Sequence, residues 1–350
     1  MVSVMLKIYR ELRINRSNNM TIKDYIIRGL KVAYRKITHT HFFPPECDCD
    51  RQSSNDKIYV LLATGNPILI ARYGTTEINC ITNYLTVHGK EPYIKKCWNY
   101  ITDQTATPWW NKDHFKTMCV YSGIFPIGQD TAERFSELYL HDSSEIDMLA
   151  CHQYVEKYMP LRKNVERIQL EMLYPFYVDK PWTRILQGKK VLVIHPFAKT
   201  IESQYGRRSL LFGNKDILPD FDLKCYAPVQ SLGGSDEYAS WFDALSHMEE
   251  DISIIDFDIA LLGCGAYGLP LGAYIKRMGK QAVHIGGGLQ LFFGIKGKRW
   301  ESEAYNDYWH YRPGVDININ YRPLFNEHWV RASKEETPAS ANKVEGACYW

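Results

Sequence analysis

The sequence predicts an α/β protein built on a doubly wound, mostly parallel sheet, with a helical N-terminal extension and a helical insertion. Two patterns indicate this fold. In the second half of the 350 residues, short apolar runs alternate with segments of helical periodicity. In addition, residues 257–285 have the pattern of a strand, a glycine turn, a helix and a second strand. The two strands of such a βαβ unit are parallel.

The first half is predicted to contain more helices than strands. A strand is expected at residues 67–73 (PILIARY), which are apolar except for one arginine near the end. Gly74 turns the chain there, and Thr75 or Thr76 can cap the helix that follows. In order, we predict a helix over 1–36, a loop over 39–55, a helix over 56–63, a strand over 67–73, a helix over 77–87, and helices over 131–140 and 144–158 within an aromatic-rich insertion at about 91–180.

The second half is predicted to carry the regular alternation of strand and helix. We predict strands over 189–194, 223–229, 257–262 and 281–285, and helices over 200–205, 235–251 (capped by Ser235) and 269–278. The expected domain boundaries separate a basic helical extension and loop (1–52), a main domain (53–330) and a polar C-terminal tail (331–350).

Composition excludes several classes of protein. Hydrophobic residues make up 45% and charged residues 23%, as in ordinary globular proteins, and the formal net charge of +2 gives no indication of nucleic-acid binding. The nine cysteines include no C-x-x-C pair, which favours reduced thiols and a cytoplasmic location. No apolar run reaches the ~18 residues of a membrane span.

The N-terminal segment differs from the rest in charge. Residues 1–40 carry nine Lys and Arg against two Asp and Glu. The segment also has a partial apolar face, formed by Ile26, Ile27, Leu30, Val32 and Ala33. Two interpretations remain open: peripheral contact with an anionic membrane at its inner face, or a solvated basic helix packed on the main domain.

A glycine turn follows the strand at 257–262. Gly263, Gly265 and Gly268 have G-x-G-x-x-G spacing and enclose Ala266 and Tyr267. Glycines between a strand and a helix let backbone N–H groups approach a phosphate or diphosphate, although they also occur in tight turns that bind nothing. The dinucleotide-binding version expects an acidic residue roughly 20 positions further on. Because the next strand ends in Ile285 and three glycines, no nicotinamide cofactor is expected.

Three polar residues stand at predicted strand ends or just beyond them. Arg72 ends an apolar strand and needs an anionic partner, which could be a diphosphate or Glu77. Glu77 could bind a metal, hold a sugar hydroxyl or act as a base, or it could serve only the helix dipole. His195 could be a second base or a packed histidine. Since parallel strands end at one edge, Arg72, His195 and Gly265 are expected near one ligand.

A basic cluster lies beyond the last strand. Lys296, Lys298 and Arg299 accompany two glycines in the stretch GIKGKRW. This composition suits contact with an anion, and it also suits a solvated basic loop.

Three stretches together resemble a known family. ARYGTTE, KKVLVIHPFAKTIESQY and GCGAYGLPLGAYIKRMGKQAVHIGGGLQLFFGIKGKRW are similar to bacterial GT-D type glycosyltransferases, and the similarity covers most of residues 56–310. The resemblance implies a Rossmann-like domain that transfers a sugar from a nucleotide-sugar donor, typically a UDP-sugar. It also implies a glycan or lipid-linked acceptor in surface-polysaccharide biosynthesis.

One motif departs from the family pattern. The family motif is R-x-G-D-G-E, and this chain has RYGTTE, in which Arg72, Gly74 and Glu77 match and Thr75 replaces the first acid. The resemblance assigns donor and metal binding to this motif. Since two carboxylates hold Mg²⁺ or Mn²⁺ far better than one carboxylate and a hydroxyl, the departure puts metal dependence in question. Two alternatives stay open: a nucleotide-dependent sugar-modifying oxidoreductase, and an inactive nucleotide-sugar-binding protein.

Overall fold

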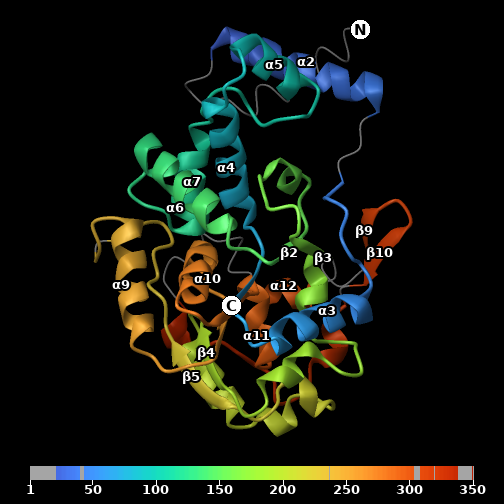
Figure 1. The fold of residues 1–350 in the computed structure, drawn as a ribbon, viewed down its shortest axis with the longest axis vertical. Helices are drawn as coiled ribbons and strands as arrows, with labels where there is room; N and C mark the ends of the chain where they lie inside the picture. Colours follow the sequence, from blue (N-terminus) through green and yellow to red (C-terminus); the bar gives the residue numbers. More distant parts are fainter. Residues whose placement is uncertain are drawn as a thin grey trace.

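A seven-stranded sheet forms the centre of the molecule (Figure 1). The structure is a computed structural model, and it describes residues 21–39, 43–235, 237–302, 308–318, 320–337 and 349. The strand order is β3-β2-β1-β7-β6-β4-β5, and every neighbouring pair is parallel. The strands are β1 (Ile68–Ala71), β2 (Met148–Cys151), β3 (Glu166–Gln169), β4 (Lys190–Ile194), β5 (Asp222–Tyr226), β6 (Ile259–Leu262) and β7 (Gln281–His284). The predicted α/β class is therefore confirmed.

The helices lie on both faces of this sheet and, at the N-terminal end of the described chain, beyond it. They are α2 (Ile22–Thr38), α3 (Arg51–Ala63), α4 (Thr75–His88), α5 (Tyr93–Ile101), α6 (Asp113–Ser122), α7 (Gln129–Ser143), α8 (Ala198–Tyr205), α9 (Trp241–Ser253), α10 (Gly268–Arg277), α11 (Leu289–Phe292) and α12 (Lys298–Glu301). Short strands form two further pairs: β8 (Ile295–Lys296) with β11 (Val330–Arg331), and β9 (Tyr308–Arg312) with β10 (Val315–Asn318).

Two hydrophobic layers hold the helices on the sheet. Successive side chains of a strand point to opposite faces, so Ile68 and Ile70 belong to one layer, and Leu69 and Ala71 to the other. The first layer packs against α3, α8 and α11, and the second against α4, α7, α9 and α10. Burial on both faces explains why β1, β4 and β6 are almost uninterrupted apolar runs.

Some predicted elements are wrong. The helix expected over 144–158 is replaced by β2 and a 3₁₀ helix at Tyr154–Tyr158. The expected helix over 235–251 begins only at Trp241, because the hydroxyl of Ser240, not Ser235, accepts the N–H of Asp243 at 3.3 Å. The prediction for residues 1–20 and most of the polar tail lies outside the described residues.

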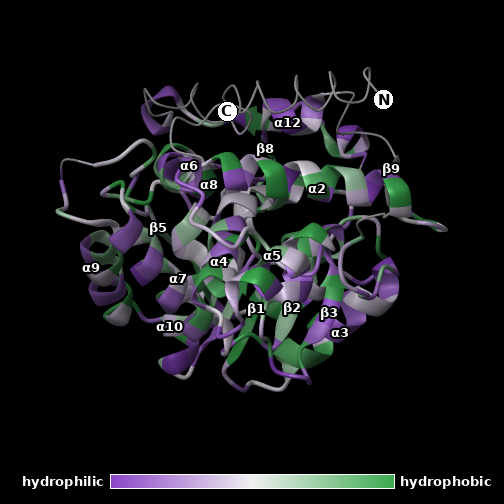
Figure 2. Cartoon of the chain, turned by 90° about the horizontal axis from the view of Figure 1, so that it is seen from above, coloured by the Kyte–Doolittle hydropathy of each residue, from purple (hydrophilic) through white to green (hydrophobic). Residues whose placement is uncertain are grey.

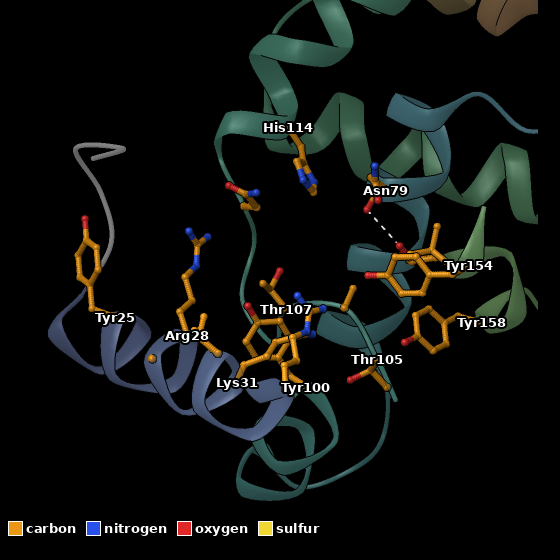
Figure 3. A pocket seen from close by; sticks show the side chains of 17 residues that line it. Tyr25, Arg28, Lys31, Asn79, Tyr100, Thr105, Thr107, His114, Tyr154 and Tyr158 are labelled. Carbon is orange, nitrogen blue, oxygen red and sulfur yellow. Dashed lines mark hydrogen bonds between the residues drawn. The ribbon is translucent and has the colours of Figure 1, made fainter. Parts of the chain in front are cut away.

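Helix α2 presents its apolar side outward. Its buried residues are Asp24 and Lys31, whereas its large apolar side chains are 50–81% exposed, at Ile22, Ile26, Leu30 and Ile37. Figure 2 looks down on this end of the molecule, where α2 and α5 lie together. A cavity lies beneath α2 (Figure 3). No helix in the described ranges combines the length and hydropathy needed to cross a bilayer.

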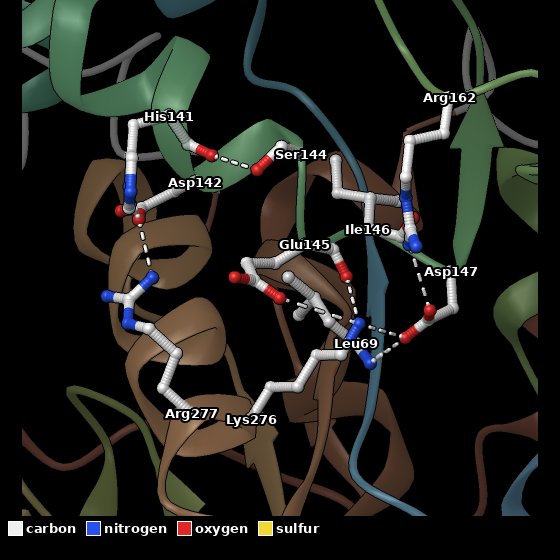
Figure 4. A network of polar contacts seen from close by, with 10 residues as sticks. All are labelled: Leu69, His141, Asp142, Ser144, Glu145, Ile146, Asp147, Arg162, Lys276 and Arg277. Carbon is white, nitrogen blue, oxygen red and sulfur yellow. Dashed lines mark hydrogen bonds and ion pairs between the residues drawn. The ribbon is translucent and has the colours of Figure 1, made fainter.

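An ion-pair network fastens the amino-terminal edge of the sheet (Figure 4). Asp147, which precedes β2, accepts the backbone N–H of Leu69 at 2.9 Å. The same carboxylate pairs with Lys276 of α10 at 2.8 Å and with Arg162 at 3.0 Å. These contacts tie β1, β2 and α10 together at the edge opposite to the carboxyl ends of the strands.

Candidate functional site

A cavity of about 600 Å³ lies at the carboxyl edge of the sheet. Six of the seven strands contribute a residue at or just beyond their carboxyl end: Arg72 (β1), His152 (β2), Leu170 (β3), His195 (β4), Gly263 (β6) and His284 (β7). Doubly wound sheets bind their ligands at this edge. The cavity therefore occupies the position expected for a substrate site.

The RYGTTE stretch forms one wall of this cavity. Arg72, Gly74, Thr75 and Glu77 all line it. Gly74 is the N-cap of α4, and Glu77 is the third residue of that helix. A Cβ on Gly74 would lie only 1.8 Å from Oε2 of Glu77, so the carboxylate folds back over the backbone of the cap. This close approach explains why glycine precedes the acid by three positions.

The Glu77 side chain is buried, and it has no hydrogen-bond or ion-pair partner among the described residues. The residue is 6% exposed. Glu77 lies in the first turn of α4, where the helix dipole is positive. Among the described residues that line the cavity, Glu77 is also the sole carboxylate.

The Arg72 guanidinium lacks an acidic partner as well. Its Nη2 atom lies 3.5 Å from Nε2 of His152, and its side chain crosses Gly286 at van der Waals distance. No carboxylate among the described residues lies within ion-pair distance of it. A half-buried cation without a counterion is stabilised by an anionic ligand.

Three histidines line the cavity, and their pKa values are lowered. Burial lowers the pKa of His195 to about 3. Burial, together with the charge of Arg72, lowers the pKa of His284 to about 3. Burial and Arg72 also lower the pKa of His152, despite the opposing effect of Glu156. The cavity is therefore lined by neutral imidazoles, which can donate or accept hydrogen bonds with a ligand without adding charge.

His195, which was predicted to be a second base or a packed histidine, is buried and has one ring nitrogen engaged by the backbone. Its Nδ1 atom accepts the backbone N–H of Phe197 at 3.0 Å. The remaining ring proton therefore sits on Nε2, and the nitrogen that could accept a proton is already engaged.

His284 and His152 were not anticipated from the sequence. Neither ring nitrogen of His284 has a hydrogen-bond partner among the described residues. Buried polar atoms without partners are costly and often mark a ligand or water site. The position of His284 could have indicated this role, because His284 lies next to the end of the strand predicted over 281–285.

The three glycines of the turn after β6 have different roles. Gly265 has a φ of +59° and lines the cavity, and a Cβ there would meet no atom within 4 Å. By contrast, a Cβ on Gly263 would lie 2.5 Å from the His195 ring, and one on Gly268 would lie 2.2 Å from the His284 ring. The outer glycines make room for the two histidines, and the middle one faces the ligand space.

The remaining predicted residues divide between the cavity and its surroundings. Ala266, Tyr267 and Arg299 line the cavity, whereas Gly268, Lys296 and Lys298 do not. Tyr267 stacks on Trp241 with ring centroids 4.7 Å apart. Lys296 instead lies 6.0 Å from the ring of Phe325.

Arg299 and several aromatic side chains complete the lining. Arg299 donates from Nη1 to the hydroxyl of Tyr349 at 2.9 Å. Tyr174, Trp300 and Tyr349 line the same region. Aromatic faces combined with hydroxyl and indole groups are suited to binding the base or the sugar of a nucleotide sugar.

The donor set does not fit a divalent metal. No cluster of three or more His, Cys, Asp or Glu side chains suited to a metal occurs in the described part of the chain. At the RYGTTE wall, Glu77 supplies one carboxylate and Thr75 a hydroxyl. Mg²⁺ and Mn²⁺ are bound mainly through carboxylates, with phosphates and water completing the shell. No catalytic step is therefore derived through a metal.

Comparisons with known proteins give little further information. No family model matches the chain, and no curated protein is similar to it. One solved structure, described as a selenomethionine-substituted domain of unknown function 1792, matches at 13% identity and a TM-score of 0.34. The match covers 88% of this chain and 99% of that one. A similarity of this strength carries no conclusion about fold or activity, which rest on the topology and the cavity described above.

Proposed function

We propose that this protein is a glycosyltransferase that moves a sugar from a nucleotide-sugar donor, a UDP-sugar, to a glycan or lipid-linked acceptor in surface-polysaccharide biosynthesis. One observation carries the proposal. A single cavity at the carboxyl edge of the sheet contains two cations, a glycine turn and one unpaired carboxylate, which are Arg72, Arg299, Gly265 and Glu77. The resemblance of the same stretches to GT-D type enzymes supports it independently.

The donor diphosphate is assigned to the cationic part of the cavity. Arg72 and Arg299 neutralise its charge, and the open side of the turn at Gly265 lets backbone N–H groups approach it. Departure of the nucleoside diphosphate develops negative charge on its oxygen, and fixed cations in a water-poor cavity stabilise that charge. The neutral histidines add hydrogen bonds to the same group.

Glu77 is assigned to the acceptor hydroxyl. Its carboxylate accepts the hydroxyl proton while the acceptor oxygen forms a bond to the anomeric carbon of the donor sugar. The bond from that carbon to the diphosphate oxygen breaks, and its electron pair leaves with the nucleoside diphosphate. The role requires a carboxylate without a competing partner, which is the condition of Glu77 in this cavity.

A pair of substitutions at Gly265 tests the donor site. Asn and Asp both tolerate the left-handed conformation at this position, and a side chain there would project into open space. Asp adds a negative charge beside the diphosphate, whereas Asn has nearly the same size and no charge. At a separation of about 6 Å and an effective dielectric constant of about 20, the repulsion is about 3 kcal/mol, or roughly 100-fold in affinity.

The measurement is UDP and UDP-sugar binding by calorimetry and thermal shift. Gly265→Asp is expected to lose most of its affinity, and Gly265→Asn is expected to retain more. Equal affinities in the two variants would contradict the assignment of the diphosphate to this turn. UDP-sugar binding without transfer to any acceptor would instead favour an inactive binding protein.

We also propose that the exposed surface formed by α2 and α5 together contacts an anionic membrane. The exposed apolar side of α2 continues into Ile94, 83% exposed, and Trp98, 60% exposed, on α5. Helix α2 also carries five Lys and Arg residues against the single acid Asp24. Apolar side chains combined with basic ones match the interface of an anionic bilayer.

A further inference from the structure

A second cavity, of about 580 Å³, lies under α2. It is enclosed by α2, by α4, by the segment that connects α5 to α6, and by the 3₁₀ helix at Tyr154–Tyr158. Figure 3 shows Arg28 reaching into this space from α2 and His114 reaching in from the opposite side, from α6. No sequence motif pointed to this site.

The lining of the second cavity is positively charged. It includes Arg28, Lys31 and Arg35, and no carboxylate among the described lining residues. Lys31 and Arg35 share Asp103, which lies just outside the lining, through contacts of 2.6 Å from each cation. Among the described residues, these three cations and the carboxylate of Asp103 sum to a formal charge of +2. Arg28 has no ion pair with any described residue.

Three polar atoms in this lining are buried without a hydrogen-bond partner among the described residues. They are Nε of Arg28, Oγ1 of Thr105 and Nδ1 of His114. Each unsatisfied buried polar group costs about 1–3 kcal/mol, which a ligand bearing several oxygens offsets. The three residues come from three separate elements and line the same cavity, so the unsatisfied atoms do not belong to one local turn.

The tyrosines of the lining suit a carbohydrate. Tyr25, Tyr100, Tyr154 and Tyr158 contribute rings and hydroxyls to one cavity. Aromatic rings pack against the apolar faces of sugars while their hydroxyls reach the sugar oxygens. The Lys31 ammonium lies 3.9 Å from the ring of Tyr100, which holds both groups in place.

Helix α4 joins the two cavities. Thr75 and Glu77 line the first cavity, and Asn79 and Thr82 line the second. Four residues of α-helix, the spacing of Thr75 and Asn79, span roughly 6 Å along the axis. The two cavities therefore lie against the same helix, about one helical turn apart along its axis.

We propose that the second cavity binds the acceptor, and that this acceptor is an anionic sugar, phosphorylated or carboxylated. The inference rests on the proposed sugar transfer, for which it names the acceptor class. The excess positive charge selects the anion, the tyrosines recognise the sugar ring, and the α4 connection directs a hydroxyl toward Glu77.

Binding of small probes tests the site without any transfer reaction. Glucose 1-phosphate, glucuronic acid, glucose and inorganic phosphate are titrated by calorimetry or NMR into the wild type and into Arg28→Gln, Thr105→Val and Lys23→Gln. Lys23 is the matched control, because it is an exposed cation of α2 that does not line the cavity. The two anionic sugars distinguish a phosphate from a carboxylate as the recognised group.

The wild type and Lys23→Gln are expected to bind at least one anionic sugar. Arg28→Gln and Thr105→Val are expected to bind that sugar at least 10-fold more weakly, because losing one hydrogen bond or charge contact to the ligand lowers its affinity by about this factor. Equal binding by Arg28→Gln and Lys23→Gln would overturn the proposal. Inorganic phosphate binding as tightly as glucose 1-phosphate would overturn the recognition of a sugar.

UDP binding separates this inference from the proposed function. UDP affinity is expected to stay unchanged in all three variants. If UDP binds and no anionic sugar does, the acceptor assignment fails while the donor site stands. If anionic sugars bind through Arg28 and UDP does not bind, the glycosyltransferase proposal fails while the second site stands as an anionic-sugar site.

Discussion

The two buried histidines beside the cavity predict a specific loss of stability in acid. The pKa of His195 and the pKa of His284 fall from an ordinary value of 6.5 to about 3 in the folded protein. Between these values the unfolded chain binds protons that the folded protein does not. Their contribution to the free energy of unfolding is therefore complete above about pH 6.5 and is lost as the pH falls toward 3.

The size of the effect follows from the pKa difference. At about pH 5 the unfolded state is favoured by about 2 kcal/mol for each histidine, or about 4 kcal/mol for the pair. That is a large part of the 5–15 kcal/mol of typical stability. A carboxylate whose pKa is raised in the folded protein acts in the opposite direction. Burial, assisted by Asp142, raises the pKa of Glu249 to about 7, so its protonation in acid stabilises the fold.

A comparison of variants isolates the histidine contribution from these carboxylates. Urea unfolding, followed by tryptophan fluorescence, is measured at about pH 7.5 and about pH 5 for the wild type and for His195→Asn with His284→Asn. Asn retains an acceptor near the position of Nδ1, so the bond from Phe197 is preserved. The double variant is expected to lose about 4 kcal/mol less than the wild type over this interval. An equal acid-induced loss in both proteins would refute the reasoning.

Further predictions concern the two cavities and the apolar face of α2. Glu77→Gln is expected to lower sugar transfer at least ~100-fold with a stability change of only about 0.3–1 kcal/mol; a normal transfer rate would remove Glu77 from the mechanism. Sugar transfer by the wild type is expected to survive a chelator in part. Thr75→Asp adds a second carboxylate and is expected to make transfer more dependent on Mn²⁺. Complete loss of wild-type transfer in EDTA, with recovery in Mn²⁺, would contradict this prediction. Wild-type protein is expected to bind anionic vesicles in a salt-sensitive manner and Ile26→Asp to bind them more weakly, as measured by co-sedimentation; equal binding to neutral vesicles would count against the membrane surface.

The sequence predicted the central strands because each is buried on both faces. The runs at β1, β4, β6 and β7 are short, apolar and bounded by glycine or charge, and such runs are typical of parallel sheets. Strand β2 was missed because its four residues follow a helical segment directly. Strand β3 was missed because an edge strand with Glu166 and Arg167 has no apolar run.

The sequence predicted which residues meet at the site wherever the strand order of the sheet alone brings them together. Arg72, Glu77, His195 and Gly265 meet in one cavity because parallel strands end at one edge of the sheet. Side-chain direction was not predictable in the same way. Lys298 is adjacent to Arg299 in sequence, yet only the arginine lines the cavity. The proton position on His195 likewise depends on a backbone N–H that no pattern in the sequence reveals.

The continuity of α4 between the two cavities has a consequence for kinetics. If the donor and the acceptor occupy these two cavities together, as proposed, the sugar can pass between them without being held on a residue of the protein. Transfer is then direct, within a ternary complex, and initial-rate plots at several fixed acceptor concentrations should intersect instead of running parallel.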